Sequence, residues 1–316
     1  MRRHATSASL VAATTIFSAA LAGCGVRSGS ASTSPSPSYS PVTAWPALPK
    51  LAEPAKGIEY AEVALPRKDG PPRKLWIYLP KGAAKKGAKL PVVFIAPAGT
   101  PLWFGMDLGD GDRDEHVPYV RAGFAVVAYA LDGPLEGGPE GKNDAELARA
   151  ANAFRASRSG IDNAEDAITY ATKRLPIDPA RMFVAGHSSA GTVAIQVAEH
   201  EPRLVGCVAY MAGTDPIGHW GAALGELEEF SPGYEAYARG IAPIPNAPNL
   251  KCPLFLCTVP DDTTVKPESV RAFARTARAT NPNVTLFEAK SGGHYDAMIA
   301  EGIPAGIRWL GAKAAK

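Results

Sequence analysis

Residues 181–191 hold the side chains best placed for covalent chemistry. An apolar run ends at Ala185, and small residues surround Ser188 before a helical stretch begins. A serine at such a tight strand-to-helix turn exposes its hydroxyl above the sheet, and the helix N-terminus behind it offers backbone N–H groups. We therefore predict Ser188 as a nucleophile. Ser189 is the rival, but reading the turn from Ser189 puts His187 where a glycine belongs.

His294 is the histidine best placed to serve as a base. A serine hydroxyl is a weak nucleophile until a neighbouring base takes its proton. His294 follows two glycines in the late loop Ser291–Asp296, after a predicted strand that ends at Glu288. Two glycines allow a sharp turn that aims the imidazole back at the nucleophile. The alternative is His219, in a loop that could reach the same place.

Asp262 is the predicted acid of this constellation. It lies in the segment Pro260–Pro267, directly after the predicted strand Pro253–Thr258. A carboxylate there would hold the imidazole in the correct tautomer and stabilise the imidazolium. The neighbouring Asp261 and Asp215, at the end of the preceding strand, remain alternatives.

Alternating strands and helices after residue 57 predict where these side chains meet. Continuous apolar runs are typical of strands buried on both faces, and the intervening helical stretches imply a mostly parallel sheet. Ligands of such sheets bind beyond the carboxyl ends of the strands, where all three candidates fall. The predicted strands are Tyr60–Leu65, Leu75–Leu79, Val92–Ala96, Phe124–Leu131, Met182–Ala185, Leu204–Met211, Pro253–Thr258 and Val284–Glu288.

The predicted nucleophile turn resembles the nucleophile elbow of the α/β-hydrolase superfamily, whose pattern is G-x-S-x-G. Ala190 occupies the last position of that pattern, and Gly191 follows one place later. The lead-in at 177–181 is similar to that of dienelactone-hydrolase-like and prolyl-oligopeptidase-like members. Residues 262–267 resemble their D-x-x-V-P turn, with one residue inserted before the proline. The order of strand, elbow, acid and histidine matches over residues 57–316.

This resemblance implies an α/β-hydrolase fold, with a mostly parallel central sheet of about eight strands flanked by helices on both faces. The short stretch 215–250 implies a small lid or none. The implied activity is that of a serine hydrolase with the triad Ser188, Asp262 and His294, which cleaves carboxylic esters through an acyl-enzyme. The alternatives are a peptidase or amidase with the same triad, and a non-catalytic surface-binding protein on this scaffold.

Backbone donors for the oxyanion are expected in two places. A tetrahedral intermediate needs preorganised N–H groups around its negative oxygen. One is the N–H of Ser189, immediately after the nucleophile. The other should come from the loop Pro97–Thr100, where we choose Gly99 over its neighbours Ala98 and Thr100.

Three further residues are candidates for a substrate pocket. Trp103 and Trp220 lie in predicted loops at strand ends, and His187 lies inside the elbow. We expect them to shape an acyl or aromatic pocket for a small-molecule ester. No cofactor and no metal are expected, because neither a C-x-x-C nor an H-E-x-x-H pattern occurs.

The N-terminus resembles the signal of bacterial lipoproteins. Arg2 and Arg3 give a positive start, and Leu10–Ala22 is apolar but too short for a mature membrane span. The segment ends in Leu-Ala-Gly followed by Cys24, the residue that lipoproteins diacylate. The resemblance implies an exported protein, anchored by lipid to a bacterial membrane at the cell surface or in the periplasm. The predicted organisation is a signal peptide (1–23), a Ser/Pro-rich flexible tether with lipidated Cys24 (24–56) and a hydrolase domain (57–316).

Charge and cysteine content exclude other classes. The formal net charge of +2 comes from the two arginines of the leader, and the remaining 31 basic residues balance 31 acidic ones. A neutral domain without a dense Lys/Arg run is not expected to bind nucleic acid. Cys207, Cys252 and Cys257 cannot all pair within the chain. Their redox state and the oligomeric state stay open.

Overall fold

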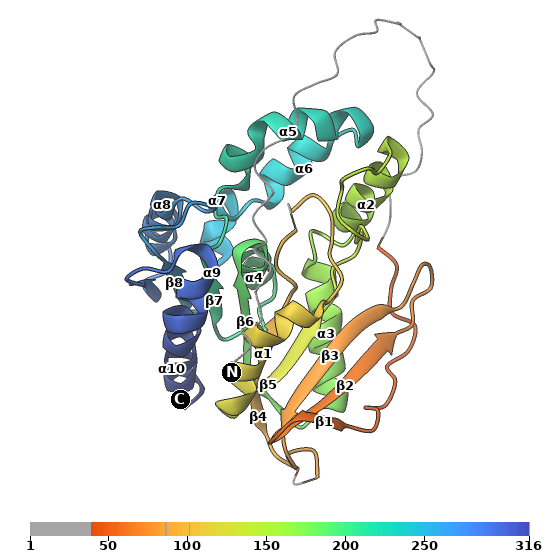
Figure 1. Ribbon diagram of the computed structural model, residues 1–316, viewed down its shortest axis with the longest axis vertical. Coiled ribbons are helices and arrows are strands. Elements are labelled where there is room, and N and C mark those ends of the chain that lie inside the picture. The colour runs from red at the N-terminus through yellow and green to blue at the C-terminus, as the bar shows by residue number, and fades with distance from the viewer. Residues whose placement is uncertain (1–38, 86, 101, 316) are drawn as a thin grey trace, which may run out of the picture. The chain divides into compact units, whose positions relative to one another are not determined.

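The computed structural model of the protein describes residues 39–85, 87–100 and 102–315, apart from the side chains of residues 219–223, 226 and 230 (Figure 1). The predicted signal peptide, Cys24 and the first part of the predicted tether therefore lie outside the described residues. The strands are β1 (Ala52–Ala55), β2 (Ile58–Leu65), β3 (Arg73–Pro80), β4 (Leu90–Ile95), β5 (Ala125–Tyr129), β6 (Ile177–His187), β7 (Cys207–Tyr210), β8 (Leu254–Thr258) and β9 (Val284–Glu288). The α-helices are α1 (Arg113–Arg121), α2 (Asp144–Ala156), α3 (Ile161–Arg174), α4 (Ser188–His200), α5 (Pro216–Phe230), α6 (Tyr234–Ile241), α7 (Pro243–Asn246), α8 (Pro267–Arg278), α9 (Gly293–Ala297) and α10 (Ile303–Ala314).

The described strands form one sheet in the order β1-β2-β3-β5-β4-β6-β7-β8-β9. The pairs β1–β2, β2–β3 and β3–β5 are antiparallel, and every neighbouring pair from β5 to β9 is parallel. In the middle of the sheet, Val93 lies in register between Val126 and Phe183. All five residues of β5 are buried, as expected of a strand covered on both faces. Each of the eight predicted strands is present, and β1 is an additional edge strand.

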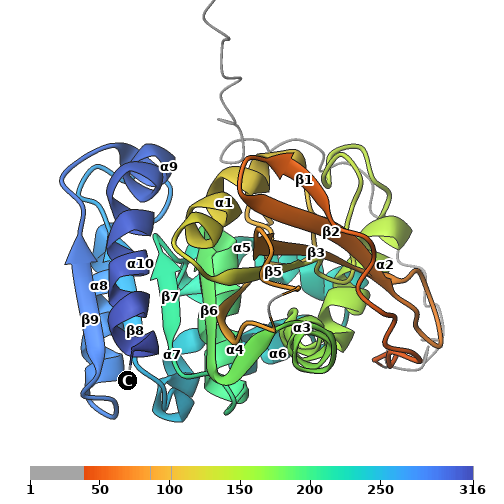
Figure 2. The same ribbon diagram turned by 90° about the horizontal axis from the view of Figure 1, so that it is seen from below.

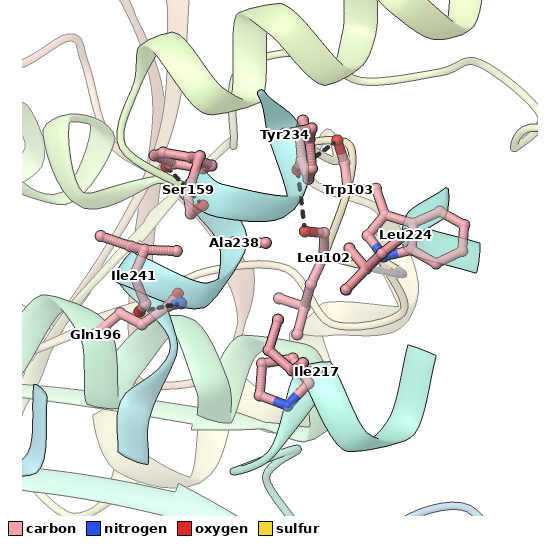
Figure 3. Close-up of a pocket in the computed structure, with 11 residues that line it drawn as sticks. Leu102, Trp103, Ser159, Gln196, Ile217, Leu224, Tyr234, Ala238 and Ile241 are labelled. Carbon is pink, nitrogen blue, oxygen red and sulfur yellow. Dashed lines mark hydrogen bonds between the residues drawn. The ribbon is translucent and has the colours of Figure 1, made fainter. Parts of the chain in front are cut away.

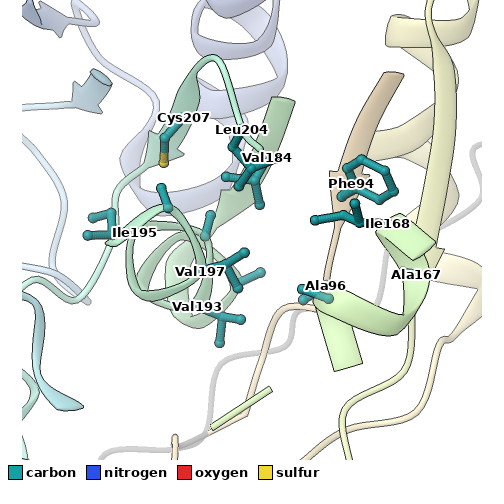
Figure 4. Packing of buried hydrophobic residues seen from close by; sticks show 14 of the residues in the cluster. Phe94, Ala96, Ala167, Ile168, Val184, Val193, Ile195, Val197, Leu204 and Cys207 are labelled. Atoms are coloured by element: carbon teal, nitrogen blue, oxygen red, sulfur yellow. The ribbon is translucent and has the colours of Figure 1, made fainter. Parts of the chain in front are cut away.

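Helices cover both faces of the sheet (Figure 2). Tyr119 of α1 and Leu310 of α10 belong to the apolar layer on one face. Ile168 of α3 and Val193 of α4 belong to the layer on the other face, where Ile168 lies near Phe94 of β4 (Figure 4). These layers fix the junction of β6 and α4, which carries the candidate nucleophile. Among the described helices, none has the length and apolarity needed to cross a bilayer.

The domain begins earlier than the sequence predicted. β1 pairs with β2, and the hydroxyl of Tyr39 donates to Oδ2 of Asp166 on α3 at 2.9 Å. Trp45 and Leu51 pack against the apolar core. The predicted flexible tether over 24–56 is therefore wrong from Tyr39 onward, because aromatic and apolar side chains in this stretch pack, partly buried, against the domain.

The segment between β7 and β8 forms three helices, α5, α6 and α7. Leu224 of α5 and Tyr234 of α6 pack with Ala151 of α2 and with Phe104 from the loop after β4. We call α2, α5 and α6 the cap; they lie together at the top of Figure 1. Residues 219 and 220, predicted to lie in a loop, are in α5, so that prediction is wrong for both residues.

Candidate active site

Ser188 lies at the junction of β6 and α4. Its φ is 53°, a left-handed conformation that is costly for any residue with a β-carbon. A β-carbon on Gly186 would lie 2.2 Å from the carbonyl oxygen of Ala190, and one on Gly191 would lie 2.9 Å from Cβ of Ala212. Strand and helix therefore pass too close for larger side chains at both glycines. Gly191 provides this close approach one position later than the G-x-S-x-G pattern does.

His294 lies beside this elbow, as the second residue of α9 rather than in an open loop. Its Nδ1 lies 2.8 Å from Oδ2 of Asp262. A carboxylate only accepts hydrogen bonds, so Nδ1 donates and Nε2 is the unprotonated nitrogen of the neutral ring. The ring of His187, the residue before Ser188, has its centroid 4.6 Å from that of His294. The base candidate thus has the tautomer that accepts a proton, and its ring packs against the residue that precedes the strained serine.

The carboxylate of Asp262 is buried and fully engaged. Its Oδ1 accepts hydrogen bonds from the backbone N–H groups of Thr264 at 2.8 Å and Val265 at 2.9 Å. These bonds fix the carboxyl group so that Oδ2 faces His294. The turn after β8 therefore presents one carboxylate oxygen to the imidazole and anchors the other.

The two alternative acids have other partners. Asp261 accepts hydrogen bonds from the N–H groups of Gly292 at 3.0 Å and Gly293 at 3.1 Å, which lower the pKa of its carboxyl group. Asp215 accepts from the N–H of Gly218 at 2.9 Å and caps α5. Sequence reasoning considered Asp261 only as a rival acid. The signal for its actual contact was a pair of glycines whose N–H groups need partners.

His187 holds the segment that carries the base. It is 4% exposed, and its Nε2 lies 2.8 Å from the carbonyl oxygen of His294. On its other side, Nδ1 lies 3.6 Å from Oε1 of Glu115 in α1. Its ring also meets the edge of Tyr295 at a centroid distance of 5.8 Å. His187 was predicted to shape a pocket, but the structure places it under the base segment, away from the pocket described below.

The loop after β4 contacts the elbow through Gly99. The Gly99 N–H, predicted as an oxyanion donor, donates to Oγ of Ser189 at 3.0 Å. Gly99 has a φ of 108°, which favours glycine. Thr100 closes the loop on itself: its hydroxyl donates to the carbonyl of Phe104 and accepts from the N–H of Leu102. The hydroxyl of Ser189 thus ties this loop to the elbow.

A small pocket lies between this loop, α4 and the cap (Figure 3). It encloses about 380 Å³, including space open to solvent. Trp103 contributes to its wall from the loop, whereas the side chain of Trp220 is outside the described part of the chain. The apolar wall includes Leu102, Trp103, Ile217, Leu224, Tyr234 and Ile241.

Polar groups lie at one side of this pocket. The hydroxyls of Ser159 and Tyr237 are 2.9 Å apart. Gln196 of α4 donates from Nε2 to the carbonyl of Ile241 at 3.0 Å, as the dashed line in Figure 3 shows. A carbonyl accepts only, so this bond fixes the orientation of the amide. The pocket therefore combines an apolar wall with a few fixed polar groups.

Neither a metal cluster nor a reactive thiol competes with the serine in the described part of the chain. No group of three or more His, Cys, Asp or Glu residues there could hold a metal ion. Cys207, Cys252 and Cys257 are free and buried. Burial raises the pKa of Cys252 and of Cys257 to about 12, so both remain thiols at neutral pH.

The sheet and the elbow together define an α/β-hydrolase. The model of the prolyl oligopeptidase family matches residues 142–305, just over half of the chain. That range contains Ser188, Asp262 and His294. The chain belongs to the prolyl oligopeptidase family, and it is a serine hydrolase.

Solved structures of other hydrolases share the fold at low identity. Acetyl xylan esterase 1 from Thermoanaerobacterium sp. JW/SL YS485 matches with a TM-score of 0.60 and 17% identity, over 84% of this chain and 87% of that one. Acetyl xylan esterase from Paenibacillus sp. R4 matches with a TM-score of 0.58 and 18% identity, over 87% and 89%. Acylaminoacyl peptidase from Pyrococcus horikoshii matches with a TM-score of 0.59 and 15% identity, over 84% of this chain and 43% of that one. Comparison with curated proteins gave no significant match.

Proposed function

We propose that the protein hydrolyses carboxylic esters of small molecules, with Ser188 as nucleophile, His294 as general base and Asp262 as its partner. The observation that carries the proposal is the 2.8 Å contact between Nδ1 of His294 and Oδ2 of Asp262. The His294 ring packs against His187, whose neighbour Ser188 is held at a φ of 53°. A carboxylate on Nδ1 keeps Nε2 available as an acceptor. It also stabilises the imidazolium that forms when the serine loses its proton.

The proposed reaction has two halves. Oγ of Ser188 attacks the ester carbonyl carbon while its proton passes to Nε2 of His294, and the imidazolium then protonates the departing alcohol. Water repeats these steps on the acyl-enzyme and releases the acid. The proposed oxyanion donors are the N–H of Ser189 and an N–H of the loop after β4 next to Gly99, whose own N–H is bonded to Oγ of Ser189. Loss of one such donor typically costs about 10²–10³ in rate.

The pocket lies against α4, the helix that begins at Ser188, although none of the three triad residues lines it, and its proposed role is to receive small apolar acyl groups. Its volume of about 380 Å³ includes open space, and most of its lining residues are apolar. We therefore expect acetyl to butyryl esters to be better substrates than long-chain ones. Support for esters also comes from the two acetyl xylan esterases, which the chain matches over 87% and 89% of their length.

Peptide or amide hydrolysis is the second candidate activity, and the family match favours it. An amide could acylate the serine of the same triad as an ester does, because only the leaving group differs. A panel of p-nitrophenyl esters and aminoacyl p-nitroanilides separates the two activities. A larger kcat/KM for the anilides would replace the ester proposal by the peptidase one.

The matched pair Ser188→Ala and Ser189→Ala tests the proposal with p-nitrophenyl butyrate. We expect Ser188→Ala to lose turnover while it keeps the circular dichroism spectrum of the wild type. Ser189→Ala keeps the backbone N–H proposed as an oxyanion donor and loses only the hydroxyl that accepts from Gly99, so turnover should stay within about tenfold of the wild type. Equal rates in the wild type and Ser188→Ala would instead indicate a protein that binds without catalysis.

We also propose that the chain is exported and anchored through a diacylated Cys24. The support is the lipobox-like sequence at residues 21–24 and the Ser/Pro-rich stretch that follows it. Expression with a radiolabelled fatty acid tests this proposal. Label in the wild type but not in Cys24→Ala is the expected result, and equal label in both would reject it.

A further inference from the structure

We propose that Asp261 and His187 are positioning residues that fix the backbone around His294 and so aim its imidazole at Ser188. The proposal rests on the proposed function, since it assigns the two residues to a base that acts on Ser188. Neither residue needs to touch the substrate. Both act through the segment Gly292–His294.

The contact between Asp261 and the base segment is bidentate. Oδ2 of Asp261 accepts from the N–H of Gly292 at 3.0 Å, and Oδ1 accepts from the N–H of Gly293 at 3.1 Å. The two glycines have φ values of 123° and 61°, in a region that residues with a β-carbon rarely adopt. A β-carbon on Gly292 would also lie 2.8 Å from the backbone nitrogen of Ala297. The turn is therefore specific in shape, and one carboxylate satisfies its two consecutive donors.

His187 holds the same segment from the elbow side. Its Nε2 lies 2.8 Å from the carbonyl oxygen of His294, and a carbonyl only accepts, so His187 donates. The two imidazole rings also lie 4.6 Å apart at 43°. Because His187 directly precedes Ser188, this bond links the nucleophile's own backbone to the backbone of the base.

The contacts of Asp261 and His187 fix the backbone around His294, which the bond between His294 and Asp262 leaves free to shift. That bond fixes one ring nitrogen of His294, but the ring can still swing about it if the backbone of the segment shifts. Asp261 fixes the two residues just before His294, and His187 fixes the carbonyl group of His294 itself. The two neighbouring carboxylates of this turn thus have different roles. Asp262 orients the imidazole ring of His294, and Asp261 orients the backbone that carries it. A displacement of about 1 Å between reacting groups can cost about 10²-fold in rate.

The test compares four variants of the full chain with one control. Asp261→Ala removes the carboxylate, and Asp261→Asn keeps one acceptor oxygen. His187→Leu removes the donor, and Gln in His187→Gln places an N–H donor near the position of Nε2. The control is Asp178→Asn. Asp178 also accepts from a backbone N–H, that of Ala180 at 3.0 Å, but at the opposite end of β6.

The expected result is a loss in kcat on p-nitrophenyl butyrate with little change in KM. Asp261→Ala and His187→Leu should lower kcat by about tenfold or more while KM stays within about twofold, because the substrate site is intact. His187→Gln should recover most of that loss. Asp261→Asn should recover only part of it, because its oxygen accepts from one glycine N–H while its NH2 group faces the other donor. Asp178→Asn should leave both parameters unchanged. A wild-type kcat in folded Asp261→Ala and His187→Leu, or a loss of equal size in the control, would overturn the proposal.

A second readout separates this proposal from the proposed function. The Nδ1 proton of His294, bonded to Asp262, should give a downfield proton NMR signal. Asp261→Ala and His187→Leu should broaden or shift this signal, and Asp178→Asn should not. If the wild type and Ser188→Ala hydrolyse esters equally, the proposed function fails, and the NMR signal still decides whether the two residues hold His294. If the signal is unchanged in all four variants, Asp261 and His187 do not position His294.

Discussion

Replacing Glu199 by glutamine is expected to remove a pH-dependent loss of stability. Glu199 lies in the second half of α4, is 6% exposed, and has no hydrogen-bond partner for either carboxylate oxygen among the described residues. Burial raises its pKa from the ordinary 4.5 to about 9. Between these two values the unfolded chain is ionised at Glu199 and the folded chain is protonated, so the folded state binds one more proton. Stability must therefore fall as pH rises through this window.

The magnitude follows from the width of the window. Each pH unit between 4.5 and 9 lowers the free energy of unfolding by about 1.4 kcal/mol. Between pH 5 and pH 7, the wild type should lose about 3 kcal/mol relative to Glu199→Gln, which does not ionise. Urea denaturation followed by tryptophan fluorescence at pH 5, 6 and 7 measures the difference, and all other titrating groups cancel in the comparison.

Glu136→Gln is the matched control, because Glu136 is exposed in the loop before α2. Its free energy of unfolding should follow the wild type across the pH range within about 0.5 kcal/mol. The reasoning is refuted if Glu199→Gln and Glu136→Gln show the same dependence on pH. In that case Glu199 would be ionised in the folded state, with a partner such as a buried water.

Three further predictions concern the site and the domain boundary. Asp262→Asn should lower kcat on p-nitrophenyl butyrate by about 10³–10⁴-fold in a folded protein, because the amide no longer favours the productive tautomer of His294; a loss below tenfold would point to another acid. Ala238→Leu adds bulk to the pocket wall and should lower the ratio of kcat/KM for p-nitrophenyl butyrate to kcat/KM for p-nitrophenyl acetate by about tenfold. An unchanged ratio would mean that the acyl group does not bind in this pocket. A chain starting at residue 57 should unfold at a lower urea concentration than one starting at Tyr39, because it lacks β1 and the bond from Tyr39 to Asp166. Equal urea midpoints of unfolding would mean that the folded domain begins at residue 57.

Much of the fold could be predicted from the sequence because parallel strands buried on both faces are apolar throughout. The buried parallel strands were found in this way, and the mostly parallel sheet is confirmed. The elbow between β6 and α4 was predicted instead from the small residues around Ser188. β1 was missed because it is a short, exposed edge strand without an apolar run. The stretch from Tyr39 to β1 was assigned to a tether because its prolines mask a few aromatic and apolar residues. Only the packing reveals that these residues contact the core and are partly buried.

The candidate site could be predicted only in part, because sequence position does not fix side-chain direction. Asp261 and Asp262 are neighbours shortly after β8, and the resemblance of residues 262–267 to a D-x-x-V-P turn was the reason to prefer Asp262. Hydrogen bonds distinguish them, since Asp262 faces the ring of His294 and Asp261 faces its backbone. The contact of Ser189 with Gly99 is equally non-local, and nothing in the spacing of these residues predicts it. The catalytic roles of Ser188, Asp262 and His294 remain predictions.

Covalent labelling of the nucleophile tests the central claim most directly. A fluorophosphonate reacts with an activated serine, and trypsin cleavage after Arg181 and Arg203 isolates residues 182–203 for mass spectrometry. We predict one label on Ser188 in the wild type and in Ser189→Ala, and none in Ser188→Ala. A label that persists in Ser188→Ala, or that maps to Ser189, would contradict the account.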